Sequence, residues 1–519
     1  MSEQAIDTLP QSPLARKHSL TIIYAAFIAG LCSIIYELLI ATTVSYFLGD
    51  SVKYFSLTIG MYMAAMGMGS FVSKYIERDL LRKFIIAELW LGVLGGMSIP
   101  VLYFAFTLGN AFVPCYIFFT LSIGFLIGLE IPFLTRLMEE YKQLQFNIAN
   151  ILSVDYLGAL IATVSFPFIL LPFFGVYQSS LLFGLVNMSI GVVMLWMFSD
   201  VLQQGVAKLK MMTTMLSGIL VLMMVCSASL LSFWDSRLYD DRIVFSEQTR
   251  YQRIVLTKHR DDIRLFLNGN LQFSSLDEYR YHESLVHVPL SLHAKPVRRV
   301  LLLGAGDGLA VRELLKYPFI EEIVLVDLDK EIIKLAKENP YVSDLNQHSL
   351  SSSKVKVVIS DAFSYLNQNE KLFDFIISDL PDPNNQELAR LYSKQFYRLL
   401  RHHLSEDGLF VTQATSPYFA PKAFWSIQKT IAAAGFDYTY PYHALIPSFG
   451  DWGFVLAGSQ TLDLAHPVLQ VDTTYLQQHH VPSLFVFSKD MAAHDEAVNT
   501  LDRPVLLEYY LQGWNSYAR

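Results

Sequence analysis

Cysteine is scarce in this sequence and is absent after residue 226. The three cysteines, Cys32, Cys115 and Cys226, all fall in long apolar segments, so they predict neither a disulfide framework nor a metal site. Charge is also low: Asp, Glu, Lys and Arg make up 17% of the 519 residues, and hydrophobic residues make up 53%. A soluble protein usually carries about 25% charged residues. Part of this chain is therefore expected to lie in a lipid bilayer.

The sequence also lacks the basic excess of a nucleic-acid-binding protein. Its formal net charge is −8, which argues against a nucleic-acid partner and is compatible with cationic ligands. It contains no solenoid repeat and no low-complexity segment. The length is sufficient for two or three domains.

The apolar excess lies almost wholly before residue 235, and a membrane span needs about 20 apolar residues. Residues 19–49, for example, contain a single charged side chain, Glu37. The pattern predicts seven spans, at residues 20–46, 54–74, 84–107, 111–134, 147–173, 176–198 and 210–233. Because six spans follow the first, we interpret the first as a retained anchor rather than a secretory signal. Residues 1–235 are thus predicted to form a multi-pass α-helical membrane domain.

Four carboxylates fall in these predicted spans: Glu37, Glu88, Glu130 and Asp155. A carboxylate in lipid is costly, so such residues are functional by default. Glu88 and Glu130 lie near span ends, where they are expected to reach the headgroups. Glu37 and Asp155 lie deeper, each beside a tyrosine that is expected to hydrogen-bond a facing helix. Helix-to-helix contact and a polyamine- or proton-related role both stay open for these two.

The pattern changes after residue 235. Short strands at "RIVFSE", "YQRIVLTK" and "IRLFLN", with an "NGN" turn at residues 268–270, predict a small antiparallel sheet over residues 240–275. Residues 277–293 have helical spacing and an acidic start. A small β-domain with its linking helix is therefore predicted over residues 236–296.

Strands and helices then alternate. Apolar strands are predicted at residues 298–303, 322–327, 354–359, 373–378 and 408–413. Unbroken apolar strands between helices indicate a doubly wound parallel sheet of the Rossmann-like α/β class, here over residues 297–457. Ligands of such sheets bind beyond the C-terminal ends of the strands. The remaining residues, 458–519, form a C-terminal extension from which no chemistry follows.

The first of these strands runs into "GAGDG", Gly304 to Gly308. Glycines at this point let backbone and ligand approach closely at a helix start. A dinucleotide fingerprint requires a third glycine where this chain has Leu309, so the pattern favours a mononucleoside over a dinucleotide.

Acids end the next three strands. Asp327 stands where a ribose-binding acid is expected, and Asp361 and Asp379 follow the third and fourth strands. Asp is also a common helix cap, and Asp329 and Asp361 could serve only as caps. Acids after three successive strands, together with the glycines at the first, favour a nucleoside site.

The stretch "SDLPDP" carries two carboxylates, Asp379 and Asp382, on a loop stiffened by prolines. An arrangement of this kind is suited to holding a cation or accepting a proton.

Residues 240–456 resemble the spermidine synthases, which are polyamine aminopropyltransferases. The motifs that carry the resemblance occur in order: "YQRI" (251–254), "LNGNLQFSSLDEYRYHESLVHVPL" (267–290), "LLLGAGDGLAVRELLKY" (301–317), "VDLD" (326–329), "SDAF" (360–363) and "SDLPDP" (378–383). That family pairs a small N-terminal β-domain with a Rossmann-like methyltransferase fold. The fusion of seven predicted spans to this domain resembles the membrane-bound branch of the family.

The resemblance implies a role for each motif residue. The thioadenosine part of decarboxylated S-adenosylmethionine, a co-substrate, would be held by Gln252, Gly304, Gly306, Asp327, Asp361 and Ala362. The aminopropyl and polyamine channel would be lined by Tyr281, His282 and Asp307. Asp379 would accept the proton, and Asp382 would bind the other amine of the acceptor. The resemblance implies neither a metal nor a further cofactor, and it implies a homodimer.

Elementary chemistry supports these roles. The donor is a sulfonium bearing an amine, and the acceptor is a diamine, so the pocket needs fixed carboxylates. An alkylammonium is neutral in only about one part in 2,500 at pH 7, and an attacking amine must lose its proton to a base within reach. A sulfonium is already a good leaving group, so most of the catalysis is alignment.

Two departures bear on the acceptor. After Pro383 the family pattern continues x-Gly-Pro-Ala, whereas this chain has Asn384, Asn385, Gln386 and Glu387, so Gln386 replaces the proline that normally touches adenine. The loop at residues 446–454 looks two residues short and has Phe449 where a tyrosine usually faces the acceptor. Putrescine is the default acceptor, and another diamine or a longer polyamine stays open.

Two other functions remain in competition. An S-adenosylmethionine-dependent amine methyltransferase shares the fold. Alternatively, the helical half is a polyamine transporter or channel, and the soluble half is its sensor. The retained "DLPDP" and "YHE" favour propylamine transfer over both.

The distribution of Lys and Arg predicts the orientation of the chain in a cell (inner) membrane. Basic residues cluster before the first span and in every second loop after it, whereas the opposite loops carry only Lys53. The positive-inside rule then places the N-terminus in the cytoplasm. Seven spans would place the catalytic domain outside, yet a cytosolic nucleoside donor requires it inside, so its side stays open.

Overall fold

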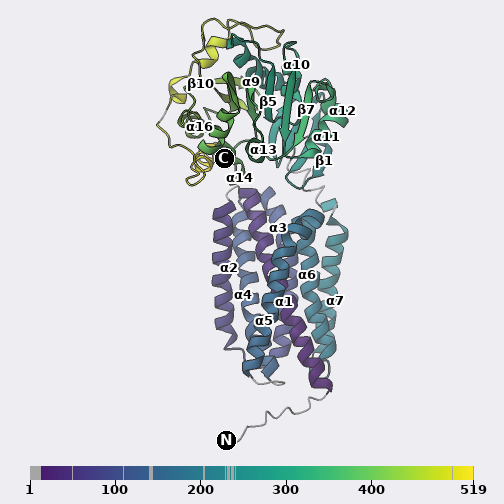
Figure 1. The fold of residues 1–519 in the computed structure, drawn as a ribbon. Helices are drawn as coiled ribbons and strands as arrows, with labels where there is room; N and C mark the ends of the chain where they lie inside the picture. The colour runs from purple at the N-terminus through teal and green to yellow at the C-terminus, as the bar shows by residue number, and fades with distance from the viewer. Residues whose placement is uncertain are drawn as a thin grey trace. The chain divides into compact units, whose positions relative to one another are not determined.

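The computed structural model describes residues 13–48, 51–108, 110–139, 144–202, 205–227, 229–230, 234, 239, 241–493 and 495–517. The chain divides into two compact units, Met1–Asp240 and Asp241–Arg519. Figure 1 draws the first in purple to blue and the second in teal to yellow. Asp235, where the sequence predicts that the membrane domain ends, lies outside the described residues.

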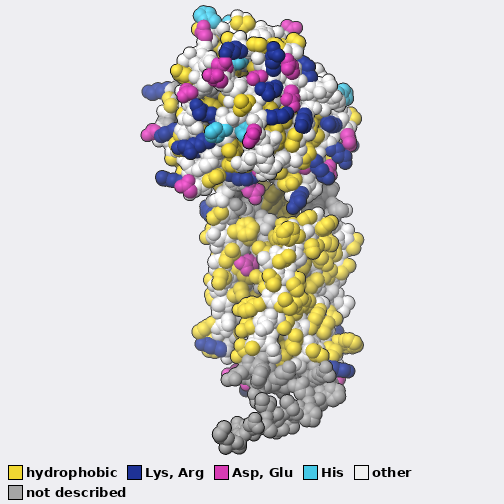
Figure 2. Space-filling view, in the orientation of Figure 1, with side chains coloured by type: hydrophobic (Ala, Val, Ile, Leu, Met, Phe, Trp, Pro, Cys, Tyr) yellow, Lys and Arg dark blue, Asp and Glu magenta, His cyan; other side chains and the backbone are white. Residues whose placement is uncertain are grey.

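The first unit is a bundle of long apolar helices. Its helices are α1 (Pro13–Leu48), α2 (Ser51–Ser73), α3 (Leu80–Thr107), α4 (Phe112–Glu139), α5 (Leu144–Ser165), α6 (Leu171–Met197) and α7 (Val206–Val225). Among the described residues, six helical runs are long and apolar enough to cross a membrane. The face of this unit drawn in Figure 2 is mostly apolar where its residues are described, and large side chains such as Phe173 and Trp196 are 77% and 76% exposed. Such a surface is suited to lipid rather than water.

The fifth of the six runs, Ile148–Met197, contains 50 residues and covers nearly all of both the fifth and sixth predicted spans. It is interrupted by a π-helical segment, Phe166–Leu170, and by the non-helical dihedral angles of Gly175 (φ 65°, ψ 179°). A run of this length is more than twice what one crossing needs. The break at Gly175 allows the run to turn, and the number of crossings stays a prediction.

The structure corrects the expectation for the acids of the bundle. Glu88 and Glu130 are 0% and 3% exposed and therefore lie inside the bundle instead of reaching headgroups. The amide of Asn187 donates to the backbone oxygen of Glu88 at 3.0 Å and to its Oε2 at 2.9 Å. Glu37 and Asp155 are only half-buried. The prediction was wrong because distance from a span end does not tell which face of the helix a residue occupies.

The tyrosines beside Glu37 and Asp155 differ in their burial. Tyr36 is fully buried, and its hydroxyl donates to the backbone oxygen of Phe183 in α6 at 3.0 Å, as expected for a contact with a facing helix. Tyr156 is 67% exposed. The expected hydrogen bond to a facing helix is therefore confirmed for Tyr36, and for Tyr156 it stays a prediction.

The second unit begins with the predicted antiparallel sheet. Its strands are β1 (Arg242–Gln248), β2 (Arg253–His259), β3 (Asp262–Leu267) and β4 (Asn270–Ser274), paired in sequence order. The positive φ angles of Asn268 (51°) and Gly269 (81°) make the predicted two-residue turn. Helix α9 (Glu278–Leu292) follows, also as predicted.

The central sheet has seven strands in the order β10-β11-β9-β8-β5-β6-β7. The five predicted strands are parallel: β5 (Arg299–Gly304), β6 (Glu322–Asp327), β7 (Val355–Ile359), β8 (Phe373–Asp379) and β9 (Leu404–Gln413). Helices between and after them include α10 (Leu309–Leu315), α11 (Lys330–Glu338), α13 (Ala362–Gln368), α15 (Lys394–His402) and α16 (Pro421–Ala433). Two buried clusters of apolar side chains, one on each side of the sheet, make up its core.

The sheet is mixed rather than purely parallel. An antiparallel hairpin, β10 (Tyr438–Ile446) and β11 (Gly450–Gly458), adds two strands at its edge. The segment 446–454, interpreted from sequence as a loop, is therefore mostly strand with a short turn. The turn binds back to the start of α9, since Asp277 accepts hydrogen bonds from the backbone nitrogen and the hydroxyl of Ser448 at 2.6 and 2.8 Å.

The C-terminal extension is folded, with its own helix α17 (Leu506–Asn515). Its apolar side chains Leu476, Val481 and Leu484 are buried in one core cluster of the unit, and Leu506 is buried in the other. The extension is thus part of the second unit.

Candidate active site

The site lies where the strand order reverses. Strand β5 has β6 on one side and β8 on the other, and the ends of β5 and β8 meet because Gly304 is the register partner of Asp379. A side chain at Gly304, where φ is +78°, would place its Cβ 2.2 Å from the backbone oxygen of Asp379. Only glycine fits this position, and ligands of such sheets bind at the reversal.

The glycine loop also packs against the acid at the end of β6. A Cβ on Gly306 would lie 2.5 Å from Oδ2 of Asp327. Asp327 Oδ1 accepts a hydrogen bond from the backbone nitrogen of Asp329 at 2.9 Å. Burial raises the pKa of Asp327 to about 6. Gly306 and Asp327, both predicted as donor-binding residues, are therefore brought together.

Gln252 reaches this corner from the small sheet. Its amide nitrogen donates to Oδ2 of Asp329 at 3.1 Å, and Thr249 donates to the same oxygen at 2.7 Å. Gln252 is thus held next to Asp327 through Asp329. Asp329 also caps α11 by accepting from the backbone nitrogen of Glu331.

Asp361 caps α13, because its Oδ1 accepts from the backbone nitrogen of Ser364 at 3.0 Å. Its Oδ2 pairs with Arg390 at 2.6 Å. Ala362, the first residue of α13, is buried. The cap interpretation of Asp329 and Asp361 is therefore correct. The ion pair to Arg390 is a contact that the motifs did not indicate.

Asp379 lies at the end of β8, where the hydroxyl of Tyr281 in α9 donates to its Oδ1. Burial raises the pKa of Asp379 to about 6, and the nearby Asp307 acts in the same direction, against His282 and the hydrogen bond from Tyr281. A carboxyl of this kind is mostly ionised near neutral pH and can still accept a proton.

His282 is buried beside this carboxyl. Its Nδ1 lies 2.8 Å from both the backbone oxygen and Oε2 of Glu278. Burial lowers the pKa of His282, but Glu278, Asp307 and Asp379 outweigh burial and raise it to about 9. The imidazole is thus a buried cation among the carboxylates.

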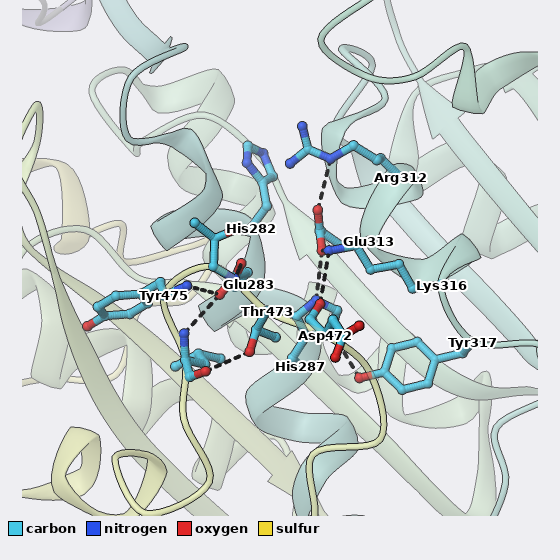
Figure 3. Close-up of polar contacts among 12 residues, drawn as sticks. His282, Glu283, His287, Arg312, Glu313, Lys316, Tyr317, Asp472, Thr473 and Tyr475 are labelled. Carbon is cyan, nitrogen blue, oxygen red and sulfur yellow. Dashed lines mark hydrogen bonds and ion pairs between the residues drawn. The ribbon is translucent and has the colours of Figure 1, made fainter.

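Arg312 completes this charge cluster. It donates to both carboxylate oxygens of Glu278, at 2.8 and 3.0 Å, and through Nε to Glu313 at 2.8 Å. Glu313 in turn lies 2.7 Å from Nε2 of His287 (Figure 3). Because these ion pairs are buried, removing one partner would leave an unpaired buried charge, which is costly. In the sequence, the role of Arg312 in this cluster is indicated only by its being the single basic residue of "LAVRELL".

Asp307, in the glycine loop, keeps one oxygen bound to the backbone nitrogen of Leu309 at 2.9 Å. Burial raises its pKa, and His282 acts in the opposite direction. Asp307, Asp379 and His282 therefore influence one another electrostatically, as expected for neighbours in the predicted channel.

Asp382 is bound by two side chains that the motifs did not predict. Gln413 donates to its Oδ1 at 3.2 Å, and Thr415 donates to its Oδ2 at 3.4 Å. Burial raises the pKa of Asp382 to about 6, although these hydrogen bonds oppose it.

The site thus combines a nucleoside-type strand end with several carboxyls, an arrangement suited to a transferase that acts on cationic substrates. Residues 278–466 match the spermine/spermidine synthase domain. The chain is 41% identical to the polyamine aminopropyltransferase of Leptospira interrogans over 95% of its length and 98% of that protein. It is 41% identical to polyamine aminopropyltransferase 1 of Ralstonia nicotianae over 99% of both chains. The spermidine synthase of Thermotoga maritima aligns with 25% identity and a TM-score of 0.44, over 48% of this chain and 87% of that one.

The chain belongs to the spermine/spermidine synthase family. The similarity to both bacterial relatives extends through the helical unit, as predicted for the membrane-bound branch. The predicted enzyme class, an aminopropyltransferase, is confirmed at this level.

Proposed function

We propose that this enzyme transfers a propylamine group from decarboxylated S-adenosylmethionine to putrescine, giving spermidine and methylthioadenosine. The observation that carries the proposal is Asp379, which is placed by its pairing with Gly304 at the sheet reversal and bound by Tyr281. Because Asp379 lies beside the glycine loop, its carboxyl is close enough to act on both the donor and the acceptor.

The donor occupies the β5–β6 corner in this proposal. Gly304 and Gly306 let the nucleoside approach the backbone, and Asp327 binds the ribose hydroxyls. The other predicted contacts of the thioadenosine come from Gln252, Asp361 and Ala362. Asp307 binds the ammonium of the aminopropyl arm, whose other end carries the sulfonium.

Transfer is a single displacement. The acceptor nitrogen attacks the methylene next to sulfur, the new C–N bond forms as the C–S bond breaks, and the electron pair leaves with sulfur as a neutral thioether. Asp379 takes the proton of the amine, and Tyr281 stabilises the carboxylate until then. Asp382 holds the second ammonium of the acceptor, so the chemistry depends mainly on alignment.

The full-length protein in detergent tests this proposal. We expect methylthioadenosine and spermidine from decarboxylated S-adenosylmethionine and putrescine. Cadaverine and spermidine should be assayed beside putrescine, because Phe449 removes a hydroxyl that the family usually has. Methylated amine formed from S-adenosylmethionine would overturn the proposal in favour of a methyltransferase, and polyamine binding without turnover would favour a sensor.

We also propose that the helical unit spans a cell (inner) membrane and that the enzyme is a homodimer, as the family resemblance implies. The six apolar helical runs support the first point. The side on which the catalytic unit lies is open, because the charge distribution and the supply of a cytosolic donor favour opposite sides.

A further inference from the structure

The strand ends of the central sheet indicate the direction in which a bound nucleoside extends. In the order β8-β5-β6-β7, these strands end at or just before Asp379, Gly304, Asp327 and Asp361. The backbone nitrogen of Ser360 donates to the backbone oxygen of Asp327 at 2.9 Å, so Asp361 follows directly beside the ribose-binding corner. In the proposed reaction the sulfur lies near Asp379 and the ribose lies at Asp327. The base, attached to the ribose away from the sulfur, is then expected over β7 and beside Asp361.

The chemistry of the base limits what the Asp361 carboxylate can do. A carboxylate only accepts hydrogen bonds, and the only donor on the adenine of a nucleoside is its exocyclic 6-amino group. The side chain of Asp361 is 23% exposed, so a ligand can reach it. A contact between this carboxylate and the base is therefore expected to be a hydrogen bond from the 6-amino group.

The two oxygens of Asp361 differ in what they already bind. Oδ1 accepts hydrogen bonds from the backbone nitrogen and the hydroxyl of Ser364, at 3.0 and 3.1 Å. Oδ2 accepts a hydrogen bond from Nη2 of Arg390 at 2.6 Å. Each carboxylate oxygen offers about two lone-pair sites, so Oδ1 is fully occupied whereas Oδ2 has room for one more donor. The 6-amino group is therefore expected to bind the same oxygen that Arg390 holds.

Arg390 is itself held in place by its own segment. Its Nε donates to the backbone oxygen of Glu387 at 3.2 Å, and its guanidinium lies 5.8 Å from the centre of the Phe363 ring. Two residues further on, the hydroxyl of Tyr392 donates to the backbone oxygen of Leu380 at 3.0 Å, in the loop after β8. The segment that carries Arg390 is thus attached both to the catalytic loop and, through Asp361, to the end of β7.

The ion pair between Arg390 and Asp361 contributes little to the stability of the fold. The side chain of Arg390 is 44% exposed, and ion pairs that are open to water in this way have small effects on the free energy of unfolding. Removal of the guanidinium is therefore expected to leave the fold intact. An effect of this ion pair on ligand binding can then be measured separately from an effect on stability.

We propose that Arg390 is a positioning residue of the donor site: its guanidinium fixes Oδ2 of Asp361 so that this oxygen accepts a hydrogen bond from the 6-amino group of the nucleoside. The inference rests on the proposed function and makes Arg390 a determinant of specificity for a 6-aminopurine. A guanidinium suits this role because its planar, rigid fork of donors holds a carboxylate in one orientation. Arg390 acts through Asp361 and does not contact the reacting atoms.

The test is a thermodynamic cycle between Arg390 and the 6-amino group, measured by calorimetry on the full-length protein in detergent. The ligands are methylthioadenosine and its purine analogue that lacks the 6-amino group. For Arg390→Met we expect the affinity for methylthioadenosine to fall about 10-fold, the usual effect of a hydrogen bond to a charged group, and the affinity for the analogue to change little. Arg401→Met is the matched control, because Arg401 pairs with Asp437 and is 46% exposed. It should bind both ligands as the unmodified protein does.

An unchanged affinity for methylthioadenosine in Arg390→Met would overturn the inference. So would an equal loss for both ligands, with or without a lower melting temperature, because Arg390 would then contact another part of the nucleoside or only support the fold.

Turnover separates the two proposals. If the unmodified enzyme transfers propylamine but the cycle shows no coupling, the inference alone fails. If it transfers none and the cycle shows the coupling, the proposed function fails and Arg390 remains a residue that selects the base of a nucleoside. Binding of neither ligand by the unmodified protein would refute both.

Discussion

At the scale of single residues, the proposed mechanism depends on one carboxyl, that of Asp379, which would accept a proton. Replacing Asp379 with Asn keeps the shape and the contact with Tyr281 but removes the base. We expect turnover to fall by about 10²- to 10⁴-fold, the usual contribution of a positioned base. Methylthioadenosine affinity, measured by calorimetry, should stay nearly the same. Near-normal turnover in the purified variant would remove Asp379 from the mechanism.

The donor side makes a separate prediction. Asp327→Ala should weaken methylthioadenosine binding, because the carboxylate that would bridge the ribose hydroxyls is lost, while the base Asp379 is untouched. A loss of about 10-fold or more is expected from a charged hydrogen bond. Calorimetry that finds the affinity unchanged would contradict the assignment.

The pH dependence follows from the raised pKa values of two acids. Asp379 and Asp382 both have a pKa of about 6, because burial disfavours their charged forms. Below that pH each carboxyl is increasingly protonated, so the base and the ammonium-binding charge are lost together. We expect kcat/KM for the acceptor to fall steeply as the pH drops through about 6. A profile that is flat between pH 5 and pH 7, or that rises toward low pH, would contradict these roles.

At the scale of helices and strands, glycines decide how closely the helices of the bundle approach. A Cβ on Gly158 in α5 would lie 2.3 Å from the backbone oxygen of Phe27 in α1, whereas Gly218 in α7 has no atom within 4 Å. Small residues at such contacts let membrane helices pack closely. We expect Gly158→Ala to destabilise the protein in detergent by about 1–3 kcal/mol, as overpacking does. Gly218→Ala, the matched control, should leave the melting temperature unchanged or slightly raised. Equal melting temperatures for the two variants would show that α1 and α5 are not in close contact.

The hairpin β10–β11 and helix α17 show the limits of local patterns at this scale. Strands β5 to β9 were predicted because each is an unbroken apolar run between helices. The hairpin strands carry the aromatic and polar mixture "YTYPYHALI", which has no clear period, and their pairing depends on the edge of β9. Strand pairing between distant segments is set by packing rather than by propensity.

At the scale of the whole molecule, the second unit should work without the first. All the predicted site residues and the partners described for them belong to the unit Asp241–Arg519. A protein that starts at Asp241 is therefore expected to fold and to retain propylamine transfer within about tenfold of the full-length rate, since in the proposed mechanism positioned groups of this unit supply the chemistry. The measurement is methylthioadenosine release from a monodisperse sample. Binding of methylthioadenosine without transfer, together with activity of the full-length protein in detergent, would mean that the spans complete the acceptor site.

The orientation in the membrane depends on the run Ile148–Met197. If it crosses twice, the chain has seven spans and the two termini lie on opposite sides. If it crosses once, both termini lie in the cytoplasm by the positive-inside rule. A compartment-sensitive reporter at the C-terminus distinguishes these topologies, and only the second agrees with a cytosolic donor.

Local sequence patterns were sufficient to predict the class of the protein and the positions of its motif residues. Strand ends, glycine turns and apolar runs are encoded by neighbouring residues, so Gly304, Asp327 and Asp379 could be placed at the ends of their strands before any contact was known. The helix caps formed by Asp329 and Asp361 could be predicted in the same way, because a capping side chain bonds only to the next few residues.

The surroundings of those residues depend on tertiary packing and could not be predicted from local patterns. Gln413 donates to Asp382, Arg312 pairs with Glu278, and Glu88 lies inside the bundle because segments far apart in the chain pack together. Periodicity shows that a helix has an apolar face, but it does not show which other element covers that face. The contacts of the Asp382 carboxyl with Gln413 and Thr415 are of this long-range kind.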